Sequence, residues 1–136
     1  MSDKNMMLVR DVMKSGCCQV DGLTTVADAL KLMRNERAHA LIIRKRDAAD
    51  EYGLVLVSDI AKKVLALNKA PDRVNVYEIM SKPVLGVKPD MQVRYCARLF
   101  NQFGLTLAPV IDSAGEILGI VNYEHLVLDG LAASID

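Results

Sequence analysis

The sequence lacks an excess of charge of either sign, a long apolar run and a signal sequence. Its 17 Lys and Arg residues equal its 17 Asp and Glu residues, so no overall field is available to recruit nucleic acid or an anionic membrane surface. No stretch approaches the roughly 20 apolar residues that span a bilayer, and no apolar signal core follows residues 1–5. We therefore expect a cytoplasmic protein that binds neither nucleic acid nor membranes.

The sequence also has few residues of the types that form disulfides, metal sites and nucleophilic active sites. Two of its three cysteines, Cys17 and Cys18, are neighbours that cannot easily bridge each other without backbone strain. Together with Cys96, His39 and His125 they show no paired spacing typical of a structural zinc site. No P-loop, nucleophile elbow or recognised Cys–His or Ser–His arrangement is present. We expect no disulfide framework, no metal site, no required cofactor and no enzymatic activity.

What the chain does contain is an internal repeat. The segment 9–13, VRDVM, is echoed by the segment 76–80, VYEIM, at a shift of 67 residues. Apolar residues continue to coincide at this shift, and later matches drift by one or two positions, which short loop insertions explain. A polar stretch with a helix-stopping proline separates the two copies. The predicted boundaries are residues 8–67 for the first repeat, 68–75 for the linker and 76–133 for the second repeat.

Each repeat has the pattern of a strand, a helix, two strands and a closing helix. Residues 25–28, TVAD, form a capping-box-like helix start, and apolar residues then recur at helical spacing. Residues 40–43 and 52–57 predict two strands of a hairpin, and residues 112–115 supply a tighter turn in the second repeat. The predicted helix stripes are Val26, Ala29, Leu30 and Met33 in the first repeat and Val93, Cys96, Ala97 and Phe100 in the second.

This pattern predicts an α+β fold of two β-α-β-β-α repeats, each with a small mixed sheet and flanking helices. A single repeat of about 60 residues would be marginally stable alone. We therefore expect the two repeats to pack about a pseudo-two-fold axis and to cover each other's apolar faces.

The residues resemble a known family, the cystathionine-β-synthase-type (CBS) domain. A short turn that ends in Met before an extended segment, at residues 11–13 and 78–83, resembles the start of a CBS repeat. The block 107–112, followed by residues 119–121, resembles the sheet of such a repeat. The resemblance covers about residues 8–132. It implies a tandem CBS pair, or Bateman module, which commonly binds adenine nucleotides in clefts between the repeats, forms disc-like dimers and regulates another protein.

In this family a Thr or Ser at the end of the last strand and an Asp three residues later hold the nucleotide, and both repeats depart from that pattern. In the first repeat Asp59 matches the ribose-binding acid, but Leu56 stands at the hydroxyl position. In the second, Asn122 can still form hydrogen bonds, whereas His125 replaces the acid. Because a lost hydrogen bond to a charged group costs roughly 1.5–3 kcal/mol, the resemblance favours the Asp59 site. Further ligand contacts, mainly from the backbone, are expected at Cys17, Cys18, Val55, Val84, Leu85 and Val121.

Simpler interpretations stay open for these residues. Asp59 follows Ser58 where a helix begins, and an acid is favoured there by the helix dipole alone. A lone histidine such as His125 is more often a packed or surface residue than a ligand. Residues 44–46, RKR, could reach phosphates, but the acids that follow on the same hairpin favour a solvated tip.

Two functions therefore remain open. The first is a regulatory module that senses an adenine-containing ligand such as AMP, ADP, ATP, NAD or S-adenosylmethionine and acts on an unidentified regulated protein. The second is a ligand-free scaffold for dimerisation and partner docking, which Leu56 and His125 favour. A homodimer is expected in either case because the apolar residues of the last helix exceed what one face can bury. These residues are Leu126, Val127, Leu128 and Leu131.

Overall fold

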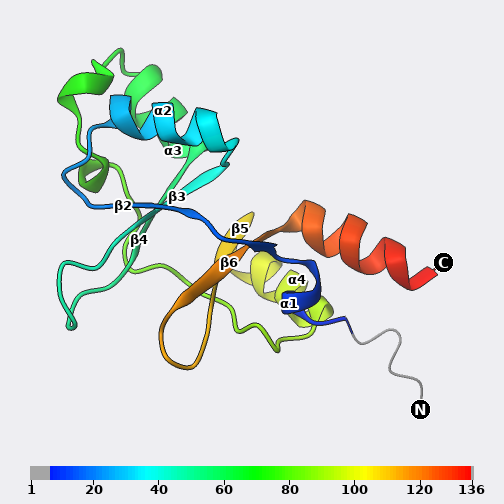
Figure 1. Ribbon diagram of the computed structural model, residues 1–136. Coiled ribbons are helices and arrows are strands. Elements are labelled where there is room, and N and C mark those ends of the chain that lie inside the picture. The colour runs from blue at the N-terminus through cyan, green and yellow to red at the C-terminus, as the bar shows by residue number, and fades with distance from the viewer. Residues whose placement is uncertain (1–6, 136) are drawn as a thin grey trace. The chain divides into compact units, whose positions relative to one another are not determined.

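The computed structural model describes residues 7–135 and has the predicted α+β architecture of short strands and helices (Figure 1). The chain forms two compact units that do not coincide with the two sequence repeats. The continuous unit comprises Cys17–Val84, and the discontinuous unit joins residues 7–16 to residues 85–135. Within the described residues, none of the helices combines the length and apolar character that a bilayer crossing requires.

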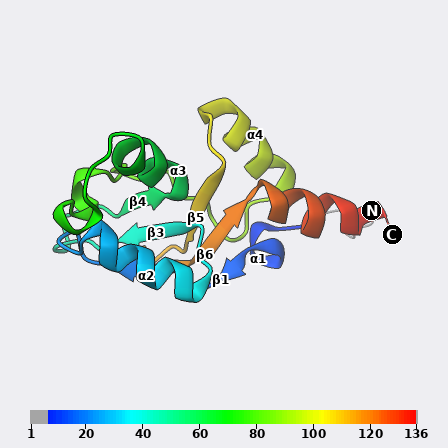
Figure 2. The same ribbon diagram turned by 90° about the horizontal axis from the view of Figure 1, so that it is seen from above.

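The continuous unit contains the predicted β-α-β-β-α order. Its strands are β2 (Cys18–Val20), β3 (Ala40–Ile43) and β4 (Gly53–Leu56), and its helices are α2 (Val26–Glu36), α3 (Val57–Ile60), the π-helical segment η1 (Ala61–Leu65) and the short 3₁₀ turns η2 (Pro71–Arg73) and η3 (Val76–Glu78). Strand β2 runs parallel to β3, and β3 runs antiparallel to β4. Figure 1 shows α2 and α3 on the same side of this sheet, and Figure 2 gives the view from above, in which β3 and β4 are drawn between the two helices. Side chains from both helices and from one sheet face form a single core.

Helix α2 begins where the sequence predicts. The Thr25 hydroxyl oxygen accepts a hydrogen bond from the Asp28 N–H at 3.1 Å, which satisfies one of the unpaired donors of the first turn. Val26 and Met33 are buried as expected, but Leu30 is 38% exposed, so the predicted stripe is wrong at this position. The buried face of α2 consists of Val26, Ala29 and Met33, and Leu30 lies at its edge.

The discontinuous unit repeats this plan with an antiparallel sheet in the order β1-β6-β5. Its elements are α1 (Val9–Val12), β1 (Lys14–Ser15), α4 (Val93–Phe103), β5 (Leu107–Ile111), β6 (Ile117–Asn122), the π-helical η4 (His125–Leu131) and the 3₁₀ turn η5 (Ala132–Ile135). The counterpart of β2 is reduced to one parallel bridge between Val87 and Val110. The predicted hairpin turn is confirmed, because Gly115 has φ +82° and donates its N–H to the Asp112 carbonyl at 3.0 Å.

The opening segment of each sequence repeat packs with the last strand of the other repeat. In the discontinuous unit, β1 pairs with β6, with Ser15 opposite Gly119. In the continuous unit, Ser81 forms the equivalent antiparallel bridge with Leu54. The segment predicted as a linker also joins the core, because Val74 is buried and its carbonyl accepts a hydrogen bond from the Val26 N–H at 2.8 Å.

Candidate functional site

The acid predicted to bind ribose lies at the start of the closing helix of the continuous unit. Asp59 follows β4 directly, and its Oδ2 accepts a hydrogen bond from the Leu56 N–H at 2.8 Å. Its Oδ1 lies 4.0 Å from Nζ of Lys63, and the Asp59 side chain is 18% exposed. One carboxylate oxygen therefore serves the helix start, and the other takes part in a loose ion pair. The sequence did not single out Lys63, although its i, i+4 spacing from Asp59 is the signal for such a pair.

The corresponding residues of the discontinuous unit form a closed pair. Asn122 Oδ1 accepts a hydrogen bond from the His125 N–H at 2.9 Å. In return, His125 Nδ1 accepts a hydrogen bond from the Asn122 N–H at 3.3 Å. Both side chains thus satisfy backbone donors at a helix start, as in a capping box. His125 therefore contributes to the start of this helix through its backbone N–H and its Nδ1 atom.

The adjacent cysteines are poor nucleophiles. Cys18 is buried in the core and donates from Sγ to Glu36 Oε2 at 3.3 Å. Burial, reinforced by the nearby Glu36 carboxylate, raises the pKa of Cys18 to about 11. Burial also raises the pKa of Cys17, which the hydrogen bond from Gln19 partly offsets. At neutral pH both thiols stay protonated, and the reactive thiolate is scarce.

The predicted ligand contacts divide between the two units. Val55 and Val121 are fully buried in the cores of their units, so only their backbone can face a ligand. In the continuous unit, Cys18 and Val55 both pair with Leu41, and Ala40 pairs with Leu56. Cys18, Val55 and Asp59 are therefore brought to the same end of one sheet. Val84 ends this unit, whereas Leu85, Val121, Asn122 and His125 belong to the discontinuous unit.

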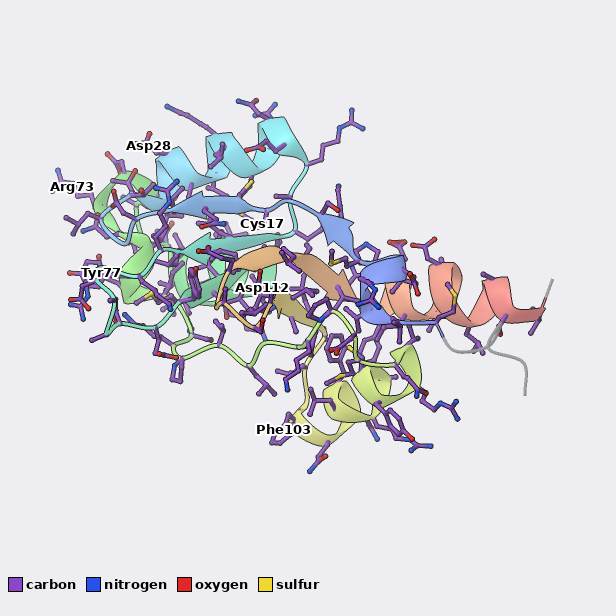
Figure 3. All side chains as sticks on the ribbon, turned by 60° about the horizontal axis from the view of Figure 1, so that its bottom comes forward. Cys17, Asp28, Arg73, Tyr77, Phe103 and Asp112 are labelled. Carbon is purple, nitrogen blue, oxygen red and sulfur yellow. The ribbon has the colours of Figure 1, made fainter. Side chains whose placement is uncertain are left out.

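A cleft that the sequence did not predict lies at the opposite end of the same sheet. We call it the hairpin cleft. It has a volume of about 570 Å³ and is lined by Asp21, Gly22, Leu23, Ile43, Arg44, Arg46, Tyr77, Met80 and Lys82. Gly22 follows the end of β2, and its carbonyl accepts a hydrogen bond from the Tyr77 N–H at 3.1 Å. Figure 3 shows Tyr77 at the end of this unit remote from Cys17. The cationic run at residues 44–46 was the one signal of this cleft in the sequence. The other lining residues Tyr77 and Lys82 come from a distant segment.

Comparison with known proteins matches both halves of the chain to one family. The sequence model of the CBS domain matches residues 9–66 and 76–128. The hexameric CBS-CP12 protein from bloom-forming cyanobacteria is similar in structure, with a TM-score of 0.88 and 37% identity, over 92% of this chain and 68% of that one. The CBS domain pair of the protein MJ0100, in complex with 5′-methylthioadenosine and S-adenosyl-L-methionine, has a TM-score of 0.78 and 26% identity over 93% of this chain and 98% of that one.

The curated relatives are longer than this chain. An uncharacterized protein from Methanopyrus kandleri is 30% identical over 76% of this chain, and the match covers 52% of that relative. Several relatives named homoserine O-acetyltransferase are matched over only 21–24% of their length. The chain therefore spans about half, or less, of most curated proteins that it resembles.

Proposed function

The chain belongs to the CBS domain family, with two copies of the domain in tandem, and from this premise we propose that it is a regulatory module that senses an adenine-containing small molecule at the Asp59 site. Membership of this family implies a regulatory role rather than a catalytic one. The raised pKa values of Cys17 and Cys18 agree with a binding role, because a nucleophilic mechanism would need an activated thiol. The small matched fraction of the acetyltransferase-named relatives supports an accessory role for this segment in those proteins.

The observation that carries this proposal is the geometry of Asp59. Its Oδ2 holds the Leu56 N–H, while Oδ1 makes only a 4.0 Å approach to Lys63. A carboxylate offers about four lone-pair positions, so Oδ1 can still accept hydrogen bonds from ribose hydroxyls. The similarity to the MJ0100 pair supports an adenosine derivative as the ligand, since both molecules named with that structure contain adenosine.

Regulation follows if the ligand binds one conformation of the module more tightly than another. A ligand shifts such an equilibrium only by its difference in affinity for the two states. The proposed partner is a regulated protein that distinguishes these states.

Isothermal titration calorimetry tests the proposal. The ligands are AMP, ADP, ATP, NAD, S-adenosylmethionine and 5′-methylthioadenosine, each taken to millimolar concentration. We expect at least one to bind and Asp59→Asn to weaken it about tenfold or more, because a hydrogen bond to a charged group is lost. Asp28→Asn is the matched control, since Asp28 occupies the same position in the first turn of α2. Absence of heat from all six ligands would refute the proposal.

A ligand-free scaffold is the second candidate, and two observations favour it. Asn122 Oδ1 and His125 Nδ1 each accept a hydrogen bond from the other residue's backbone N–H, and Leu56 supplies no hydroxyl. Exposed apolar residues on η4, such as Leu128 and Leu131, support self-association, as does the hexameric assembly of the cyanobacterial relative. Native mass spectrometry of freshly purified protein separates the two functions, because a scaffold gives an oligomer without a retained small molecule.

A further inference from the structure

The hairpin cleft has an apolar floor that the backbone keeps open. Ile43, Met80, Tyr77 and Leu23 all line the cleft. Tyr77 is 49% exposed and Leu23 is 75% exposed. A Cβ atom at Gly22 would lie 3.1 Å from Cβ of Tyr77 and 3.7 Å from Cγ2 of Ile43. A larger residue at position 22 would therefore crowd Tyr77, whereas its contact with Ile43 would be an ordinary van der Waals contact, so glycine leaves room beside Tyr77.

The rim of the cleft is cationic and partly fixed in place. Lys82 Nζ lies 2.6 Å from Asp50 Oδ1, and Arg46 Nε lies 3.1 Å from Asp50 Oδ2. The Asp50 side chain is only 7% exposed, and Lys82, with Arg46, holds its pKa well below the ordinary value. Asp50 therefore stays ionised and anchors the two cations from segments that are distant in the sequence.

Arg44 is the third cation of the rim. Its Nη2 donates a hydrogen bond to the Gln19 carbonyl at 2.9 Å, which orients the guanidinium beside the end of β2. A guanidinium carries five N–H donors, so this bond leaves others for an anion. With Asp21 and Asp50 counted against Arg44, Arg46 and Lys82, the cleft carries one positive charge in excess.

We propose that the hairpin cleft binds a small organic anion in which a flat apolar body carries a carboxylate or phosphate group. The apolar body would contact Tyr77 and Leu23, and the anionic group would contact Arg44 and Lys82. The volume of about 570 Å³ lies within the roughly 300–1,000 Å³ typical of small-molecule sites. A single excess charge suits one anionic group and does not suit a polyanion such as nucleic acid.

This site is separate from the Asp59 site and does not depend on it. Ile43 and Gly53 pair at the cleft end of the sheet, whereas Ala40 and Leu56 pair at the Asp59 end. A molecule in the cleft would contact the hairpin between β3 and β4, and a molecule at Asp59 would contact the start of α3.

Four probes test the combination of apolar body and anion by calorimetry: 1-naphthyl phosphate, 1-naphthoate, 1-naphthol and inorganic phosphate. We expect naphthyl phosphate or naphthoate to bind at least tenfold more tightly than naphthol or phosphate alone. The better of the two anions identifies the preferred head group. Equal binding of naphthol, or absence of binding by both joined probes at millimolar concentration, would overturn the proposal.

Variants locate the probe. Arg44→Gln and Tyr77→Ala are each expected to weaken the joined probe about tenfold, since they remove a charged hydrogen bond and an apolar contact. Lys45→Gln is the matched control on the same hairpin, because the Lys45 ammonium lies over the Tyr52 ring and Lys45 does not line the cleft. Asp59→Asn is expected to leave the affinity unchanged. If Tyr77→Ala fails to fold, Arg44→Gln, which changes an exposed residue, tests whether the probe binds in the cleft. Unchanged affinity in that variant would place the probe elsewhere.

Discussion

The side chains of Asn122 and His125 each accept a hydrogen bond from the other residue's backbone at the start of the π-helical segment η4. The Asn122 amide oxygen accepts the His125 N–H at 2.9 Å, and His125 Nδ1 accepts the Asn122 N–H at 3.3 Å. In the other unit, the Asp59 carboxylate accepts the Leu56 N–H in the same way, at 2.8 Å. Histidine at this position therefore still supports the helix start, although it lacks the carboxylate that Asp59 would offer to the proposed ligand.

His125→Ala should destabilise the protein, whereas His125→Asp should not. The alanine variant leaves the Asn122 N–H without its acceptor, and we expect a loss of about 0.5–1.5 kcal/mol in the free energy of unfolding. The aspartate variant restores an acceptor at the same place and also restores the family's acid. Urea unfolding followed by circular dichroism measures the difference, and an alanine variant as stable as the parent would contradict it.

Substitutions at Asp59 should separate its structural role from its proposed ligand role. Asp59→Asn keeps an oxygen for the Leu56 N–H, so we expect stability within about 0.5 kcal/mol of the parent. Asp59→Ala removes that oxygen and should cost about 1 kcal/mol. Thermal unfolding of both variants, with calorimetry for ligand, checks this. Equal destabilisation by both would mean that the charge, rather than the hydrogen bond, supports the helix start.

Local signals in the sequence predicted most elements of the fold correctly. Thr25 marks the start of α2, Gly115 marks the second hairpin turn, and the spacing of Val26 and Met33 identifies the buried helix face. Such features depend on backbone hydrogen bonds and on periodic burial within a short stretch. The family resemblance added the position of Asp59, which the structure places at a helix start.

The features that the sequence did not reveal depend on contacts between distant segments. The pairing of Ser15 with Gly119 joins residues from different repeats, and no local pattern signals it. The hairpin cleft likewise needs Lys82 beside Asp50, a contact that charge counting along the hairpin cannot foresee. The acids after residues 44–46 indicated a neutralised tip, and Asp50 does pair with Arg46, but it also pairs with Lys82 from a distant segment.

Two equivalent glycines should respond differently to alanine because of what lies in front of each. A Cβ at Gly119 would meet the backbone of Lys14 and Ser15 in β1, which cannot move without breaking the strand pairing. A Cβ at Gly53 would meet the flexible Met80 side chain most closely and would approach Cβ of Ile43 to 3.1 Å, but it would meet no backbone atom that close. We expect Gly119→Ala to cost about 3 kcal/mol and Gly53→Ala clearly less, as seen in denaturant unfolding. Similar losses for both would show that β1 yields as easily as Met80.

The buried thiols should react slowly in the folded protein. Burial raises the pKa of Cys96 to about 11, and burial with Glu36 does the same for Cys18. At pH 8 their thiolate fraction is about 100-fold below that of a thiol with a pKa near 9, so alkylation by iodoacetamide should be slowed at least as much.

The same shifts fix the sign of a pH effect on stability. Because folding disfavours both thiolates, the stabilisation is complete below pH 9 and is lost as the pH rises toward the folded pKa of about 11.

The alkylation rate of each cysteine is measured by peptide mass spectrometry after timed reaction with iodoacetamide. Modification of Cys96 in native protein at the rate seen in urea would contradict the raised pKa.

Charged substitutions on the last helix should dissociate the proposed homodimer. Leu128 and Leu131 are 61% and 62% exposed within the chain, and exposed apolar residues on one helix are typical of a surface that another protein covers. Glutamate at either position would place a charge in that interface, where an unpaired buried charge is strongly unfavourable. Multi-angle light scattering at micromolar concentration should give a dimer or larger assembly for the parent and a monomer for Leu128→Glu and Leu131→Glu. Leu23→Glu, at a still more exposed leucine far from this helix in sequence, should leave the assembly unchanged. A monomeric parent protein would refute self-association through η4.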